Sequence, residues 1–316
     1  MANISTRKVE QEYDAWEHIC ADAFDNPKRG AIAVVTAYFD ESYNHPKAGT
    51  DEPLMYTVAC YITTKENWKK SRKEWRIELA KKGLDHFHMN RFEWARSEVI
   101  AGRELSTKNP YYGWHKEDFD QLLDKLHHVI NRKDKSGAYR LVAFMTEVLR
   151  TDFDETRPEE LKNDPQCRSY YIFCVSNIME AIARWADLST YYDPIHYVFA
   201  GGANEGGNLE RWFNYCWKHP GIKAHFRLGK GYSRFPYDTQ YANDEPALQM
   251  ADTAAYEFNK AAMLWVQRGF RDMDKSEMRR SLGSLARTDH AGWLFRKEEL
   301  LQTYDAIIKH RRRFPA

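Results

Sequence analysis

The chain has 316 residues, of which 43% are hydrophobic and 14% aromatic, so it can bury a large core as one big domain or two smaller ones. Its 47 Lys and Arg residues and 46 Asp and Glu residues leave a net charge of +1, which excludes a global basic field and requires any nucleic-acid contact to come from local patches. The five cysteines form no CxxC pair, which favours reduced thiols. The first residues are polar and unlike a signal peptide, and no apolar stretch reaches roughly 20 residues. We therefore expect a cytoplasmic protein without membrane contact.

The first half of the chain predicts antiparallel strands followed by helices. Residues 31–40 and 55–62 are rich in β-branched and aromatic residues, and a Pro/Gly/Asp-rich loop joins them, so we expect two neighbouring antiparallel strands. Thr63 or Thr64 is expected to cap a charged helix that ends before Gly83. The other predicted elements are an amphipathic helix in 1–30, a short strand at 86–89, an irregular stretch through Tyr112, a helix over 117–133 and a strand over 138–149.

The second half alternates more regularly between helices and strands. We expect helices over 165–188, 209–218, 246–270 and 296–313, and strands over 195–199 and 222–228. Antiparallel strands followed by strand–helix alternation predict an α/β fold, with a mixed sheet flanked by helices in one elaborated domain.

An acidic tripeptide, Asp40-Glu41-Ser42, follows the first predicted strand. A carboxylate at the end of a central strand lies beside a desolvated core, where it usually coordinates a cation or accepts hydrogen bonds. The alternative is an ordinary turn, because Asp and Ser side chains followed by Tyr43-Asn44-His45-Pro46 suit a loop.

A polar stripe marks the predicted helix over 246–270. Gln249, Asp252 and Tyr256 share one helix face, and small residues such as Ala251 and Ala255 allow a close approach to a sheet. The stripe is typical either of a functional face or of a solvated one.

These segments resemble the domain-of-unknown-function 3800 family, which is regarded as RNase H-like. The shared motifs are Phe39-Asp40-Glu41-Ser42, Phe87-His88 and Leu248-Gln249-x-Ala251-Asp252-x-x-Ala255-Tyr256, in that order. The resemblance implies an RNase H-like domain over 31–270, with a helical extension over 1–30 and another over 271–316.

The resemblance also implies a metal-dependent site. Asp40 and Asp252 would hold one or two Mg²⁺ or Mn²⁺ ions, which prefer oxygen ligands, with Glu41 nearby and Ser42 and Gln249 in support. His88 would orient water or contact phosphate, although a structural role for this histidine remains open.

One position departs from the family pattern. Its members commonly carry a glutamate after the strand that matches 195–199, whereas this chain has Ala200, which cannot bind a metal. Three explanations stay open: natural degeneration, replacement by a neighbour such as Glu205, or a deliberate inactivating substitution.

A basic and aromatic segment lies between residues 211 and 237, without an acidic residue from Arg211 to Tyr237. Cations that neutralise phosphates next to aromatic rings suit single-stranded nucleic acid or RNA, although solvated faces also produce such runs. The candidate nucleic-acid contacts are Lys218, Lys223, Arg227, Lys230 and Arg234.

The function expected from these features is hydrolysis of phosphodiester bonds by a metal-dependent nuclease, inactive if Ala200 removes an essential ligand. The first alternative is a catalytically silent subunit that binds nucleic acid or assembles with a partner protein or further copies of the chain. The second is a phosphohydrolase acting on small nucleotides.

Overall fold

The computed structural model describes residues 35–44, 54–200, 206–228, 245–269, 285 and 289–313. The expected helical extension over 1–30, the candidate metal ligand Glu205 and the candidate nucleic-acid contacts Lys230 and Arg234 lie outside these residues.

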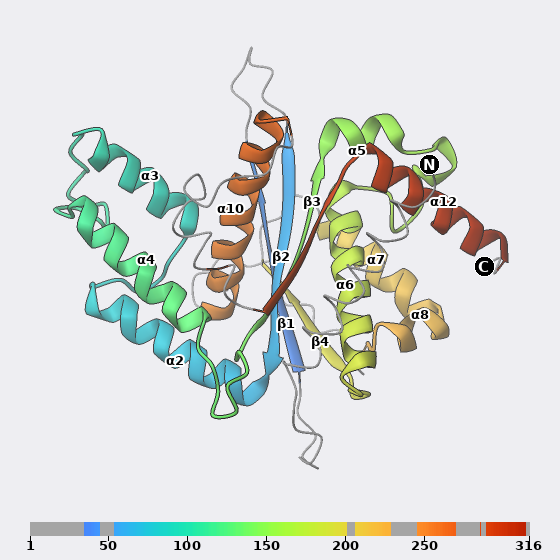
Figure 1. The fold of residues 1–316 in the computed structure, drawn as a ribbon, viewed down its shortest axis with the longest axis horizontal. Coiled ribbons are helices and arrows are strands. Elements are labelled where there is room, and N and C mark those ends of the chain that lie inside the picture. The colour runs from blue at the N-terminus through green and yellow to red at the C-terminus, as the bar shows by residue number, and fades with distance from the viewer. Residues whose placement is uncertain are drawn as a thin grey trace, which may run out of the picture.

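A five-stranded mixed sheet forms the centre of the fold (Figure 1), in the order β4-β1-β2-β3-β5. Strands β1 and β2 are antiparallel, as are β2 and β3, whereas β4 runs parallel to β1 and β5 parallel to β3. The prediction of a mixed α/β sheet is therefore confirmed. The strands are β1 (Val35–Tyr43), β2 (Met55–Thr64), β3 (Val142–Leu149), β4 (Ile195–Phe199) and β5 (Asp289–Phe295).

Helices cover both faces of this sheet (Figure 1). One face carries α2 (Lys65–Lys81), α3 (Met89–Ile100), α4 (Lys116–Ile130) and α10 (Pro246–Gln267). The other carries α5 (Arg150–Thr156), α6 (Tyr170–Leu188), α7 (Gly206–Lys218), α8 (Pro220–His225) and α12 (Lys297–Arg313), with a short 3₁₀ turn at Glu159–Leu161.

Alternation along the strands divides the core into two halves. Tyr38 of β1 packs on the α10 side of the sheet, and its neighbour Phe39 packs on the α6 side. Helix α10 lies closely against β1 and β2, because Ala251, Ala254 and Ala255 are small and fully buried. This close packing fixes which residues of α10 face β1.

Several helices and strands were predicted correctly. Thr64 caps α2 by accepting a hydrogen bond from the Asn67 amide, and Pro246 opens α10. Strand β4 has the predicted bounds, 195–199.

Other predictions were wrong. Residues 86–88 form no strand, and the supposedly irregular stretch after them contains α3. The strand expected at 222–228 is mostly the short helix α8, which begins at Pro220. The segment 271–316 is not only helical, because it contributes the edge strand β5 to the sheet.

No helix within the described ranges is long and apolar enough to cross a membrane.

Candidate functional site

Asp40 lies within β1, level with the point where the neighbouring strand β4 stops. Strand β1 continues three residues beyond Asp40 to Tyr43, so the expectation that Asp40 ends its strand was wrong. Phe39 pairs with Phe199, the last residue of β4, and the Ala200 amide still donates to the Phe39 carbonyl at 2.9 Å. Ala200 packs with Val198 and Tyr38 in the core half that contains α10. Asp40 and residue 200 therefore neighbour each other on the same side of the sheet.

Asp252 of α10 reaches the same region. Its Oδ2 atom accepts a 2.7 Å hydrogen bond from the Met89 amide at the start of α3, and His88 Nδ1 lies 3.5 Å from that oxygen. Asp252 is mostly buried, with 13% of its side chain exposed, whereas the His88 side chain is 46% exposed. His88 therefore lies beside Asp252 and faces solvent.

The two carboxylates act on each other electrostatically. Burial raises the pKa of Asp40 well above its usual range, and the negative charges of Asp252 and Glu41 raise it further. Burial also raises the pKa of Asp252, while His88 and the Met89 amide oppose that shift. A cation near both groups would relieve this repulsion.

Gln249 supports the site from one turn earlier in α10. It is buried, and its Oε1 atom accepts hydrogen bonds from Trp75 Nε1 at 2.8 Å and from the Phe87 amide at 3.1 Å. The second bond holds the chain directly before His88 and Met89. Gln249 therefore positions the segment that contacts Asp252.

An ionic cluster that the sequence did not predict anchors the start of α10. Glu245 caps the helix by accepting from the Ala247 amide, and its Oε1 also lies 2.6 Å from Arg72 Nε. Arg72 in turn donates to the Tyr38 hydroxyl, two residues before Asp40. The signal available in the sequence was Glu245 before Pro246, a residue that suits the first helical turn.

Glu41 and Ser42 occupy different positions. The regular pairing of β1 with β2 continues through both residues, so the Glu41 side chain lies on the face opposite Asp40. Ser42 shares the face of Asp40, and its carbonyl oxygen accepts a 3.3 Å hydrogen bond from Asn259 of α10. Glu41 therefore influences Asp40 through its charge and its backbone, since its amide donates to Asp40 Oδ1 at 2.8 Å.

The donor set fits a hard divalent cation that keeps water ligands. Within the described ranges, no group of three or more His, Cys, Asp or Glu side chains is arranged to hold a metal. Asp40 and Asp252 each commit one oxygen to a backbone amide, and their other oxygens accept no hydrogen bond from the described residues. Mg²⁺ in proteins is often bound by one or two carboxylates together with waters and substrate phosphates.

The predicted nucleic-acid segment is only partly available for binding. Arg227 donates to the backbone carbonyls of Tyr191, Ala183 and His225 and pairs with Asp187, leaving 9% of its side chain exposed. It holds the end of α6, so it is not a free phosphate ligand. Lys223 lies 3.6 Å from the centre of the Trp217 ring, and Lys218 is exposed.

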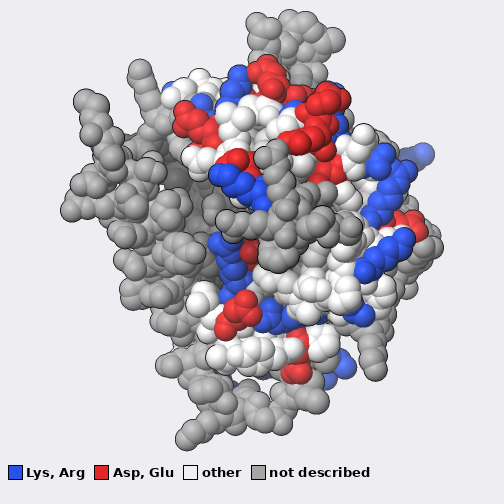
Figure 2. Space-filling view, turned by 90° about the vertical axis from the view of Figure 1, so that its right-hand side faces the viewer, with Lys and Arg blue, Asp and Glu red and all other residues white. Residues whose placement is uncertain are grey.

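Charge on the side that carries α8 and α12 is mixed. Among the residues described there, basic and acidic side chains are interspersed (Figure 2). The described part of this surface shows no uniform basic track.

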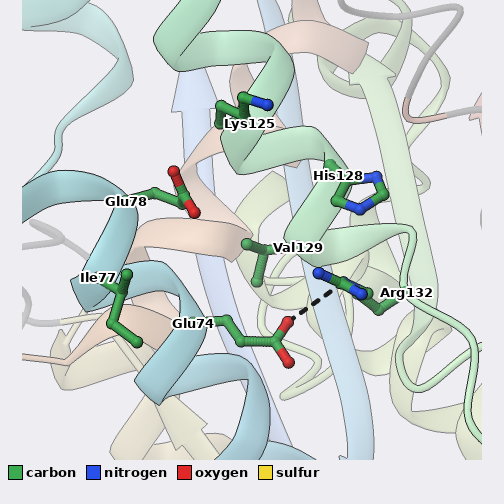
Figure 3. Close-up of a pocket in the computed structure, with 7 residues that line it drawn as sticks. All are labelled: Glu74, Ile77, Glu78, Lys125, His128, Val129 and Arg132. Carbon is green, nitrogen blue, oxygen red and sulfur yellow. Dashed lines mark ion pairs between the residues drawn. The ribbon is translucent and has the colours of Figure 1, made fainter. Parts of the chain in front are cut away.

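A pocket of about 330 Å³ lies between α2 and α4, and neither Asp40 nor Asp252 lines it (Figure 3). Glu74 and Arg132 form an ion pair across it, 3.4 Å apart. None of the candidate site residues lines this pocket, whose lining is Glu74, Ile77, Glu78, Lys125, His128, Val129 and Arg132.

Comparisons with protein-family models, curated proteins and solved structures found no match to this chain.

Proposed function

We propose that this protein is a metal-dependent nuclease of RNase H-like type, with Asp40 and Asp252 as ligands of Mg²⁺ or Mn²⁺. The observation that carries the proposal is the meeting of these two residues, 212 positions apart, on one side of the central sheet beside His88. The five-stranded mixed sheet with helices on both faces also supports it, because it is compatible with the α/β fold that the resemblance implies.

In this proposal the aspartates hold the metal ion and His88 acts on the substrate. Asp40 and Asp252 supply the two uncommitted carboxylate oxygens, and Met89 and Glu41 amides hold their other oxygens in place. When bound, a divalent ion neutralises phosphate charge and lowers the pKa of a bound water. His88 is exposed and can donate to a phosphate oxygen or transfer a proton at its free ring nitrogen.

Ala200 favours a second candidate, a catalytically silent subunit that binds nucleic acid. Its methyl group is buried beside Asp40, where the family pattern has a carboxylate. Such a protein would retain the fold and the two aspartates without hydrolysing a phosphodiester bond.

Cleavage assays separate these candidates. Wild type, D40N, D252N and A200E would be incubated with single- and double-stranded DNA and RNA in Mg²⁺, in Mn²⁺ or in EDTA, with mononucleotides as a further substrate. D305N, which alters an exposed ion pair on α12, serves as the control.

The proposal predicts metal-dependent polymer cleavage that D40N and D252N abolish and D305N retains. Cleavage by A200E alone would identify the wild type as a degenerate nuclease. Absence of cleavage by every variant, with nucleic acid still bound, would favour the silent subunit, and turnover of mononucleotides alone would favour a phosphohydrolase.

A further inference from the structure

Helix α3, whose first amide binds Asp252, carries an exposed arginine and an exposed tryptophan on its outer face. Phe92 and Ala95 bury the inner face of this helix completely. Arg91 and Trp94 lie on the outer face, one turn apart, and 54% of Trp94 is exposed. The exposed indole presents a flat aromatic face on which another ring can stack.

Arg91 has no acidic partner in the part of the chain that the structure describes, unlike its neighbours. Arg96 of the same helix pairs with Asp120 at 2.7 Å, and Arg103 pairs with Glu98 at 2.6 Å. An arginine without a counter-charge keeps its guanidinium available for an anion.

Arg91 lies at the end of α3 that contacts the site. Helix α3 begins at Met89, whose amide binds Asp252, and a rise of about 1.5 Å per residue puts Trp94 only about 8 Å further along the axis. Two charged groups affect the pKa of the buried Tyr111 hydroxyl. Burial raises this pKa most, the positive charge of Arg91 lowers it, and the negative charge of Asp252 raises it. Arg91 and Asp252 therefore both lie near Tyr111.

We infer that Arg91 and Trp94 bind single-stranded nucleic acid and lead it to Asp40 and Asp252. Arg91 pairs with a backbone phosphate, and the indole of Trp94 stacks on an unpaired base. This inference rests on the proposed function for the identity of the ligand as a polynucleotide. A duplex is excluded from this contact, because its bases are stacked on one another and their faces are covered.

The surface of α7 and α8 is the competing location, since the sequence predicted contacts there. Trp217 is 40% exposed, but the Lys223 ammonium group already lies over its ring. Arg227 already pairs with Asp187 of α6 and donates to the Tyr191 carbonyl. The α3 surface offers an arginine without an acidic partner among the described residues, next to an indole that no cation covers.

Binding without catalysis tests the inference. Fluorescence anisotropy would follow fluorescein-labelled oligothymidylate, oligouridylate and a DNA duplex in EDTA, over a range of salt concentrations. The α3 variants are R91A, R91K, W94A and W94F, and the matched variants on the competing surface are K223A and W217A.

W94A should bind both single strands about tenfold more weakly, a loss of about 1.4 kcal/mol and within the range for stacking on one base. R91A should reduce the slope of log affinity against log salt by about one. W94F and R91K should bind nearly as wild type does, because they keep the ring and the charge. A stronger response to oligothymidylate or to oligouridylate identifies DNA or RNA as the preferred ligand.

Unchanged binding by R91A and W94A would overturn the inference, and weaker binding by K223A and W217A would move the contact to α7 and α8. A wild type that binds no oligonucleotide would also overturn it. Because these measurements contain no metal, their outcome is independent of cleavage and of Mg²⁺-dependent melting, which test the proposed function.

Discussion

The Ala200 amide donates a 2.9 Å hydrogen bond to the carbonyl oxygen of Phe39, although β4 ends one residue earlier. Parallel pairing therefore extends just far enough to hold residue 200 beside Asp40. A longer side chain at position 200 would project on the same side of the sheet as Asp40 and Asp252.

A200E should create a metal-dependent stability that the wild type shows less strongly. Three carboxylates in proximity repel one another unless a divalent ion neutralises them. In EDTA, A200E should melt below A200Q by about 2–4 °C for each kcal/mol of repulsion. Mg²⁺ or Mn²⁺ should raise the Tm of A200E more than that of wild type, because binding to the folded state stabilises it by mass action.

A200Q is the control for size, since its side chain matches glutamate without the charge. Equal melting of the two variants at every Mg²⁺ concentration would mean that residue 200 does not share a metal site with the aspartates.

Q249L should destabilise the protein and weaken its response to Mg²⁺. The substitution leaves two buried donors, Trp75 Nε1 and the Phe87 amide, without the oxygen that they share. Each unsatisfied donor costs about 1–3 kcal/mol, and the chain before Met89 loses its attachment to α10. Denaturant unfolding with and without Mg²⁺ measures both effects.

T253V is the matched control for Q249L. Thr253 is buried one turn further along α10, and its hydroxyl donates only to the Gln249 carbonyl within the same helix. It should lose less stability than Q249L and keep the full Mg²⁺ response. If T253V and Q249L behaved alike, Gln249 would have no particular role in positioning residues 87–89.

The sequence predicts the elements whose residues carry strong local preferences. Strands β1, β2 and β4 come from β-branched and aromatic runs, and α10 begins at a proline that suits a first helical turn. The meeting of Asp40 with Asp252 was implied by the family resemblance, because no local pattern relates residues so far apart.

The wrong predictions concern segments whose structure depends on tertiary contacts. His86-Phe87-His88 alternates like a strand, but the Phe87 amide bonds to Gln249 and the Met89 amide to Asp252. Residues 222–228 also alternate in polarity, yet Pro220 starts the short helix α8. Arg227, two residues after the end of that helix, has a positive φ of 50°. Strand β5 contains Asp289, His290 and Gly292, of which Asp and Gly are uncommon in strands. It is a strand because it pairs with β3.

The charge of Arg227 illustrates the limit for surface predictions. A basic residue in an aromatic segment has the composition of a nucleic-acid contact, whether its guanidinium faces solvent or caps a neighbouring helix. Only the contacts to Asp187 and to the carbonyl of Tyr191 distinguish these cases.

Stability should depend on pH through Asp40 and through a buried acid of β3, Glu147. Glu147 is a buried residue of β3, its Oε1 has no hydrogen-bond partner among the described residues, and burial raises its pKa to about 8. Asp40 also has a raised pKa, through burial and the charges of Asp252 and Glu41. Both acids hold their protons more tightly in the folded state than in the unfolded chain.

The sign of the effect follows from linkage. The stabilising contribution of each protonated acid is complete below its unfolded pKa, about 4, and is lost as the pH rises through its folded pKa. For Glu147 the loss continues up to about pH 8. D40N and E147Q should each be more stable than wild type at neutral and alkaline pH, and less dependent on pH, because an amide does not titrate.

The two variants should differ in their response to metal. Mg²⁺ should reduce the loss of stability at high pH in wild type and in E147Q, since the ion favours the charged form of Asp40. D40N should lack this effect. Melting temperatures in Mg²⁺ and in EDTA across the pH range measure it, and an equal Mg²⁺ response in D40N and E147Q would show that Asp40 is not a metal ligand.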